Sequence, residues 1–141
     1  MVIPLAGQLD KIWYHCHIQD MTSAATDKKQ LFFMGDSRNR LREFPEAVRR
    51  DFGFALDLVQ AGLTPHNSRP KSGYGPGVLE LAEDCAGDTY RAAYIAKLKS
   101  GIYVLHAYQK KSKSGRKIPP QDIHILKQRL KDALEEDQRR T

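Results

Sequence analysis

Two stretches of the chain combine cations with side chains that can stack on bases or move protons. Arg91 has a tyrosine beside it in a run typical of a β-strand, and a second such run contains His106, Tyr108 and Lys110. Guanidinium and ammonium groups hold phosphates, aromatic rings stack on bases, and histidine exchanges protons near neutral pH. We therefore take Arg91, His106, Tyr108 and Lys110 as candidate catalytic residues for chemistry on a nucleic-acid backbone.

Each of these residues also has an ordinary structural interpretation. Tyrosines at alternate strand positions are often core residues whose hydroxyl reaches the wet rim of the core. A single histidine within a strand is more often a hydrogen-bonded core residue than a catalyst. The sequence leaves both interpretations open.

Positive charge is concentrated in one region of the chain. Its 141 residues include 23 Lys and Arg against 17 Asp and Glu, a net charge of +6, yet no acid lies between Asp88 and Asp122. A solubilising surface usually mixes both signs, so this interval favours a polyanionic partner, although most lysine runs are only solvated loops. Strand periodicity places Lys97 on the same face as Arg91. The candidate RNA-binding cations of this region are Lys97, Lys111, Lys113 and Arg116.

Several chemistries are disfavoured by what the sequence lacks. It contains no P-loop, no nucleophile elbow and no zinc-protease motif, and its two cysteines, Cys16 and Cys85, lack the spacing of a metal or disulfide framework. The acids of the predicted strands are expected near the first turn, away from the basic stretch, which argues against a carboxylate-held Mg²⁺. These acids are Glu80, Glu83, Asp84 and Asp88. With no apolar run long enough to cross a bilayer, we expect a cytoplasmic protein without metal or cofactor.

The N-terminal half of the pattern predicts one strand and two helices. A strand over residues 31–34 is followed by a short helix capped by Asp36 or Ser37, and Pro45 opens a longer helix. Residues 64–76 are rich in Pro and Gly and are interpreted as a loop.

The C-terminal half predicts three strands and a final helix. The strands begin near Gly77, Thr89 and Gly101, and their short connectors indicate an antiparallel meander. The helix begins near Pro120 and presents an apolar face, while its charged end is expected to fray. We therefore expect an α+β fold, a curved antiparallel sheet with an N-terminal helical hairpin and a C-terminal helix, in the order β-α-α-β-β-β-α. The apolar face consists of Ile123, Leu126, Leu130, Ala133 and Leu134.

The chain is predicted to divide into an extension and one domain. Residues 1–28 show neither helical nor alternating periodicity and are expected to be poorly ordered. Residues 29–141 are expected to form a single domain, since they suffice for one core.

Four runs of the sequence resemble a known toxin superfamily. They are FMGDSRNRLREFPEAVR, GVLEL, YRAAYIAK and YVLHAYQKKSKSGRKIPPQDIHILKQRLK, within residues 31–134. Together they resemble the RelE/ParE superfamily of bacterial toxins, in particular its phage-related HigB-like branch. The resemblance implies a RelE-like fold and a type II toxin neutralised by an antitoxin that carries a helix-turn-helix domain, which would be the only link to DNA.

The resemblance also implies RNA-contacting positions. In relatives that cleave RNA, basic residues of the sheet and of the preceding loop contact the RNA backbone, and the matching positions here are Arg91, Lys71, Lys110 and Lys111. Relatives often have an arginine where this chain has Ala82, so the match of the site is incomplete.

The expected function is therefore a metal-independent messenger RNA endoribonuclease, with or without dependence on the ribosome. In the simplest metal-free route the ribose 2′-hydroxyl attacks the neighbouring phosphate. DNA lacks this hydroxyl and is therefore not cleaved. Two alternatives remain open at this point. One is a ParE-like inhibitor of DNA gyrase without nuclease activity, and the other is a degenerate phage-derived protein that only binds its partner.

Overall fold

The computed structural model describes residues 28–111 and 119–141, with the side chain of Lys111 not included. It confirms an α+β fold, and none of the described helices is long and apolar enough to cross a bilayer. Residues 1–27 of the predicted extension 1–28, together with Lys113 and Arg116, lie outside the described residues. The elements are β1 (Leu31–Phe33), α2 (Ser37–Arg42), α3 (Glu46–Gln60), β2 (Ser68–Pro70), β3 (Val78–Cys85), β4 (Asp88–Ile95), β5 (Ile102–Lys111) and α4 (Pro120–Arg140).

The five described strands form one mixed sheet in the order β1-β5-β4-β3-β2. The meander β3-β4-β5 is antiparallel as predicted, because its short connectors allow no other arrangement. The prediction of an all-antiparallel sheet is wrong for β1, which pairs in parallel with β5. Two helices and three strands lie between β1 and β5 along the chain, so no turn constrains their relative direction.

A short strand occurs within the region that was interpreted as a loop. Residues 68–70 form β2, which pairs antiparallel with β3 and places Arg69 opposite Glu80. Pro70 is compatible with this position because β2 is at the edge of the sheet, where a missing N–H leaves no ladder bond unmade.

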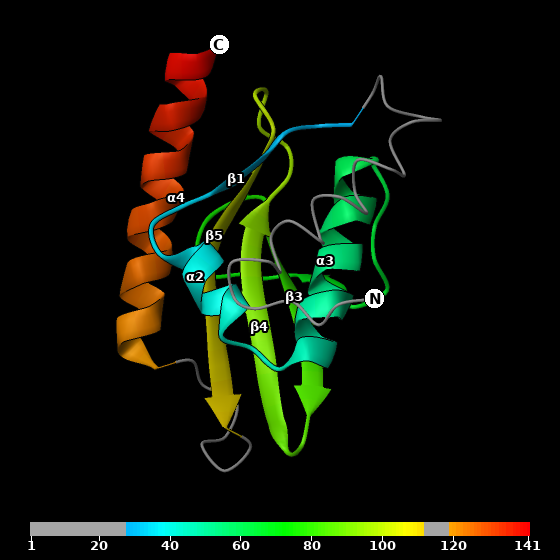
Figure 1. Cartoon of the computed structure of the whole chain (residues 1–141). Helices are drawn as coiled ribbons and strands as arrows, with labels where there is room; N and C mark the ends of the chain where they lie inside the picture. The colour runs from blue at the N-terminus through cyan, green and yellow to red at the C-terminus, as the bar shows by residue number, and fades with distance from the viewer. Residues whose placement is uncertain (1–27, 112–118) are drawn as a thin grey trace.

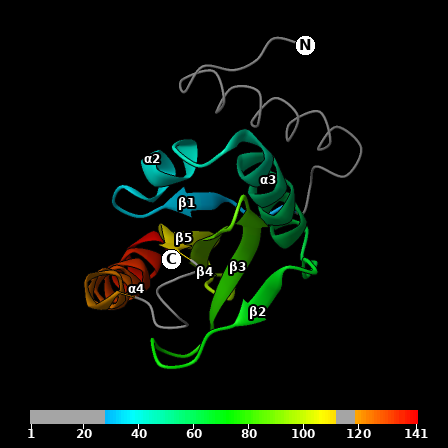
Figure 2. The same cartoon turned by 90° about the horizontal axis from the view of Figure 1, so that it is seen from below.

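The sheet separates two helical layers. Figures 1 and 2 show α2 and α3 on one side of the sheet and α4 on the other. The side toward α3 packs Phe52 and Leu56 against Leu81, while the side toward α4 packs Leu126 against Leu105. We call the second side the α4 face.

An irregularity in β5 decides which residues share the α4 face. Ala93 pairs with His106, but the next residue of β4, Tyr94, pairs with Val104, so Leu105 is an extra residue in β5. Such a bulge lets two successive side chains point to one side and reverses the alternation beyond it. His106 and Tyr108 therefore share the α4 face with Leu105, whereas strict alternation would have put them on the opposite face.

The end of α4 is more ordered than its charge suggests. The helix continues to Arg140, although the sequence predicted fraying after Leu134. Asp137 is buried and accepts hydrogen bonds from the backbone N–H of Ser100 at 2.7 Å and from its hydroxyl at 2.6 Å. The guanidinium of Arg140 also lies 4.2 Å from the ring centre of Phe32. A charged helix end is thus fixed to the sheet by specific contacts.

Two leucines of α4 test this placement, because the sequence pattern assigned both to the apolar face. Leu126 is 0% exposed and Leu134 is 41% exposed. We expect Leu126→Ala to lower the free energy of unfolding by about 2–5 kcal/mol. Leu134→Ala, the matched control, should change it by no more than about 0.5 kcal/mol. Urea unfolding measures both, and equal losses would contradict the packing of α4.

Candidate functional site

Four polar side chains meet on the α4 face around one buried carboxylate. The Glu80 carboxylate, on β3, accepts a hydrogen bond of 2.6 Å from Arg91 Nη1 on β4 and another of 2.6 Å from the Tyr108 hydroxyl on β5. Lys71 Nζ lies 3.7 Å from the same carboxylate. We call Lys71, Glu80, Arg91 and Tyr108 the Glu80 cluster.

The register of the sheet brings these side chains together. Glu80 lies opposite Ala93, and Arg91 lies opposite Tyr108, so they occupy neighbouring positions on three adjacent strands. The bulge at Leu105 is necessary here, because it places Tyr108 on the same face as Arg91. Lys71 continues the line of β2, since its N–H donates to the carbonyl of Val78.

The cluster is buried at its centre and open at its edge. The side chain of Glu80 is 4% exposed, whereas those of Arg91 and Lys71 are 23% and 29% exposed. The buried Nε of Arg91 has no hydrogen-bond partner. One carboxylate thus faces two cations that retain contact with solvent, and the local charge is positive.

Tyr108 acts in this cluster as a neutral donor. Burial raises its pKa far above the usual range, and the adjacent Glu80 carboxylate raises it further. The hydroxyl therefore stays protonated. It donates a hydrogen bond to Glu80, and it can donate one to another acceptor that enters the cluster. Arg91, whose charge is permanent, is the second donor.

The structure corrects one expectation about charge. Glu80 was expected near the first turn, away from the cations, but it lies in the middle of the sheet and is hydrogen bonded to Arg91. The α4 face is therefore not the acid-free cradle that the sequence pattern predicted.

The remaining predicted cations divide into three groups. Lys110 is buried on the α4 face, two residues beyond Tyr108. Lys97 is not brought to the cluster: β4 ends at Ile95, so Lys97 lies beyond the strand and cannot share its face with Arg91 as predicted. Lys111 pairs through its backbone with Asp88. The RNA-binding roles of Lys97, Lys111, Lys113 and Arg116 stay predictions.

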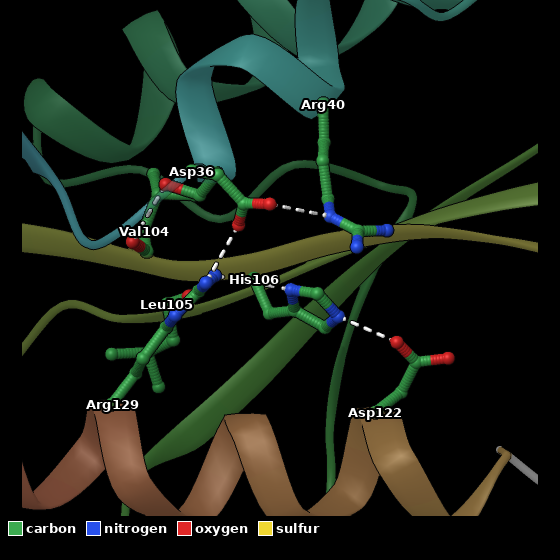
Figure 3. Close-up of polar contacts among 8 residues, drawn as sticks. Asp36, Arg40, Val104, Leu105, His106, Asp122 and Arg129 are labelled. Carbon is green, nitrogen blue, oxygen red and sulfur yellow. Dashed lines mark hydrogen bonds and ion pairs between the residues drawn. The ribbon is translucent and has the colours of Figure 1, made fainter.

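His106 belongs to a separate network that fastens α4 to the sheet (Figure 3). Its ring is buried, and Nε2 lies 2.7 Å from the carboxylate of Asp122 in the first turn of α4. Arg129 Nη1 lies 3.2 Å from the other ring nitrogen and 3.1 Å from the carbonyl of Leu105. Arg129 also donates to Asp36 at 2.6 Å, so the network spans α2, β5 and α4.

This network fixes the protonation state of His106. Because a guanidinium can only donate, Nδ1 of His106 accepts from Arg129, and the ring proton lies on Nε2 and is donated to Asp122. Burial lowers the pKa of His106, against the raising effect of Asp122, and the positive charge of Arg129 lowers it further. Both nitrogens of a neutral ring are thus engaged. A role for His106 in moving protons stays a prediction that this geometry does not favour.

Asp36 takes part in this network instead of capping α2 with its side chain. No side-chain cap bond forms, and the carboxylate instead binds Arg129 at 2.6 Å and Arg40 at 3.0 Å. Partial burial raises its pKa, but these hydrogen bonds outweigh that effect and lower the pKa of Asp36 to about 2. The predicted cap was wrong because a partner ninety-three residues away competes for the same oxygen atoms.

Sequence reasoning missed Glu80 as a member of the Glu80 cluster, and Asp122 and Arg129 as members of the His106 network. Glu80, the third residue of β3, has no partner nearby in the sequence. Its neighbours on β2 and β4 can be named only once the strand register is known. Arg69 is exposed and pairs with Glu80. The sequence pattern did not predict this pairing, because residues 64–76 were interpreted as a loop. One available signal was strand alternation, which puts Glu80 on the same face as Val78, an apolar residue that is buried on the α4 face.

The described residues contain no group of three or more His, Cys, Asp or Glu that could hold a metal ion.

Residues 39–131, which include the whole Glu80 cluster, match the family model of the phage-derived Gp49-like proteins (DUF891). The chain belongs to this family. The Gp49-like proteins are a RelE-like toxin family of phage-related context. Neither the curated proteins nor the solved structures gave a match.

The neutral state of His106 makes the stability of this Gp49-like protein depend on pH. Its pKa in the folded chain lies below the usual histidine value of 6.5, so the unfolded chain takes up the proton first. The contribution of neutral His106 to the free energy of unfolding is therefore fully present above pH 6.5. It falls as the pH drops below that value. We expect His106→Gln, which retains a donor for Asp122, to lose less of its free energy of unfolding than the wild type between about pH 7 and about pH 5.

Urea unfolding at the two pH values measures the difference. His66 and His124 are present in both proteins, so they cancel in the comparison. Equal losses in the two proteins would show that His106 is not held neutral.

Proposed function

We propose that this chain is the toxin of a type II toxin–antitoxin pair and that it cleaves messenger RNA at the Glu80 cluster without a metal ion. The partner in this proposal is an antitoxin with a helix-turn-helix domain, as the resemblance to the RelE/ParE superfamily implies. Membership of the Gp49-like family supports a toxin of this general kind. The nuclease activity is argued from the site itself.

The observation that carries the proposal is a buried carboxylate held between donors suited to a phosphate. Glu80 binds Arg91 and Tyr108, both at 2.6 Å, with Lys71 at 3.7 Å. Here a potential base lies beside two cations and a neutral hydroxyl, which are the groups that cleavage by a ribose hydroxyl requires.

Each member of the cluster has a role in the proposed reaction. Glu80 takes the proton of the ribose 2′-hydroxyl, whose oxygen then attacks the adjacent phosphorus. Arg91 and Tyr108 donate hydrogen bonds to the non-bridging phosphoryl oxygens, where negative charge accumulates. The bond from phosphorus to the 5′-oxygen breaks, and Lys71 supplies the proton to that oxygen. The products are a 2′,3′-cyclic phosphate and a 5′-hydroxyl, and Lys110 adds positive charge on the same face.

Substitutions in the cluster test the proposal. We expect Glu80→Gln and Arg91→Ala each to lower kcat/KM for cleavage of a single-stranded RNA about 100-fold or more, because each removes a group that acts in the transition state. Lys131→Ala, which removes an exposed cation of α4, is the matched control and should leave cleavage unchanged. Cleavage is measured in the presence of EDTA, and circular dichroism confirms that each variant is folded.

A folded Glu80→Gln protein that cleaves as fast as the wild type would refute the assigned role of Glu80. The same protein samples are added to gyrase and supercoiled plasmid. Inhibition of gyrase together with intact RNA would replace the nuclease proposal by the gyrase-inhibitor alternative.

A further inference from the structure

The loop between β2 and β3 brings one more aromatic residue to the Glu80 cluster. Gly75 in this loop lies directly against Leu130 of α4, and the neighbouring Tyr74 packs against the apolar cluster that includes Val78 and Ile95. Gly73 and Gly77 have φ values of +95° and +83°, which side-chain-bearing residues rarely adopt. The loop is therefore shaped by its glycines and holds Tyr74 on the α4 face.

Tyr74 follows Lys71 of the Glu80 cluster by three residues and packs on the same face of the sheet. Burial raises the pKa of Tyr74, and the charge of Glu80 raises it further, while Arg91 opposes both. Tyr74 also contributes to the raised pKa of Tyr108. The hydroxyl of Tyr74 has no hydrogen-bond partner among the described residues. Tyr74 thus packs against the core of the α4 face, and the charges of Glu80 and Arg91 act on its hydroxyl.

The other described tyrosines are unavailable for stacking. The sequence suggested that tyrosines beside the cations could stack on bases, but four of them are core residues, with side chains no more than 8% exposed. Tyr74 alone among the five described tyrosines is partly exposed. The buried four are Tyr90, Tyr94, Tyr103 and Tyr108.

We propose that Tyr74 stacks on a base next to the scissile phosphate, so that the substrate is single-stranded RNA with an unstacked base at that position. This inference rests on the proposed function. An aromatic ring beside a phosphate site is the usual way to hold a base of a single strand, because every base has a stacking face. Bases inside a duplex cannot reach the ring. Tyr74 is therefore a residue beside the Glu80 cluster that selects single strands over duplexes.

The test measures binding separately from cleavage. The probe is a fluorescent single-stranded 2′-O-methyl RNA, which lacks the attacking hydroxyl and stays intact on the wild-type protein. We expect Tyr74→Leu to raise its Kd about 5- to 150-fold, the range for loss of one stacked base. Tyr74→Phe keeps the ring and should stay within about twofold of the wild type. A 2′-O-methyl duplex should bind all three proteins equally.

An abasic nucleotide moved along the probe distinguishes stacking from a change in the loop. At one position, loss of the base should weaken binding to the wild type and leave binding to Tyr74→Leu unchanged. An unchanged Kd for Tyr74→Leu, or losses that add at every position, would overturn the inference. Binding that depends on Tyr74 without cleavage of ordinary RNA would sustain the stacking contact alone and would refute the nuclease activity.

Discussion

A charged carboxylate in the middle of a sheet is stable only when partners compensate it, and this requirement governs the α4 face. The side chain of Glu80 is 4% exposed, and removing it from water is costly unless cations and donors surround it. Arg91, Tyr108 and Lys71 meet that requirement from two other strands and one loop. The same groups are those that would bind a phosphodiester. Stability and proposed chemistry thus depend on one set of contacts.

Two features of β5 and α4 make this arrangement possible. The extra residue at Leu105 shifts the alternation of β5, so that Tyr108 faces Glu80 instead of α3. Nearby, His106 and Asp122 fix the first turn of α4, and Arg129 joins this pair to Asp36. The fully engaged His106 is then part of the framework beside the cluster, and the proposed mechanism assigns the proton transfers to residues of the cluster itself.

Much of the fold follows from the sequence, because helices and hairpins are set by neighbours along the chain. The meander, both long helices and the α+β class are of this kind, and the four toxin-like runs indicated the superfamily. The errors concern contacts between distant residues. Glu80 was expected near a turn, Asp36 or Ser37 as a helix cap, and Lys97 on the face of Arg91, because the residues that surround them are distant in the chain. The direction of β1 and the bulge at Leu105 leave no signal in composition or short-range periodicity.

The central claim is that the cluster cleaves RNA through the ribose 2′-hydroxyl with Glu80 as the base. The most direct measurement uses an RNA oligonucleotide with one 2′-deoxy nucleotide at the mapped cleavage position, incubated with the wild-type protein in EDTA. The account predicts that cleavage stops at that position alone, while the all-RNA control yields a 2′,3′-cyclic phosphate end. Continued cleavage at the deoxy position, or a product without the cyclic phosphate, would contradict the account.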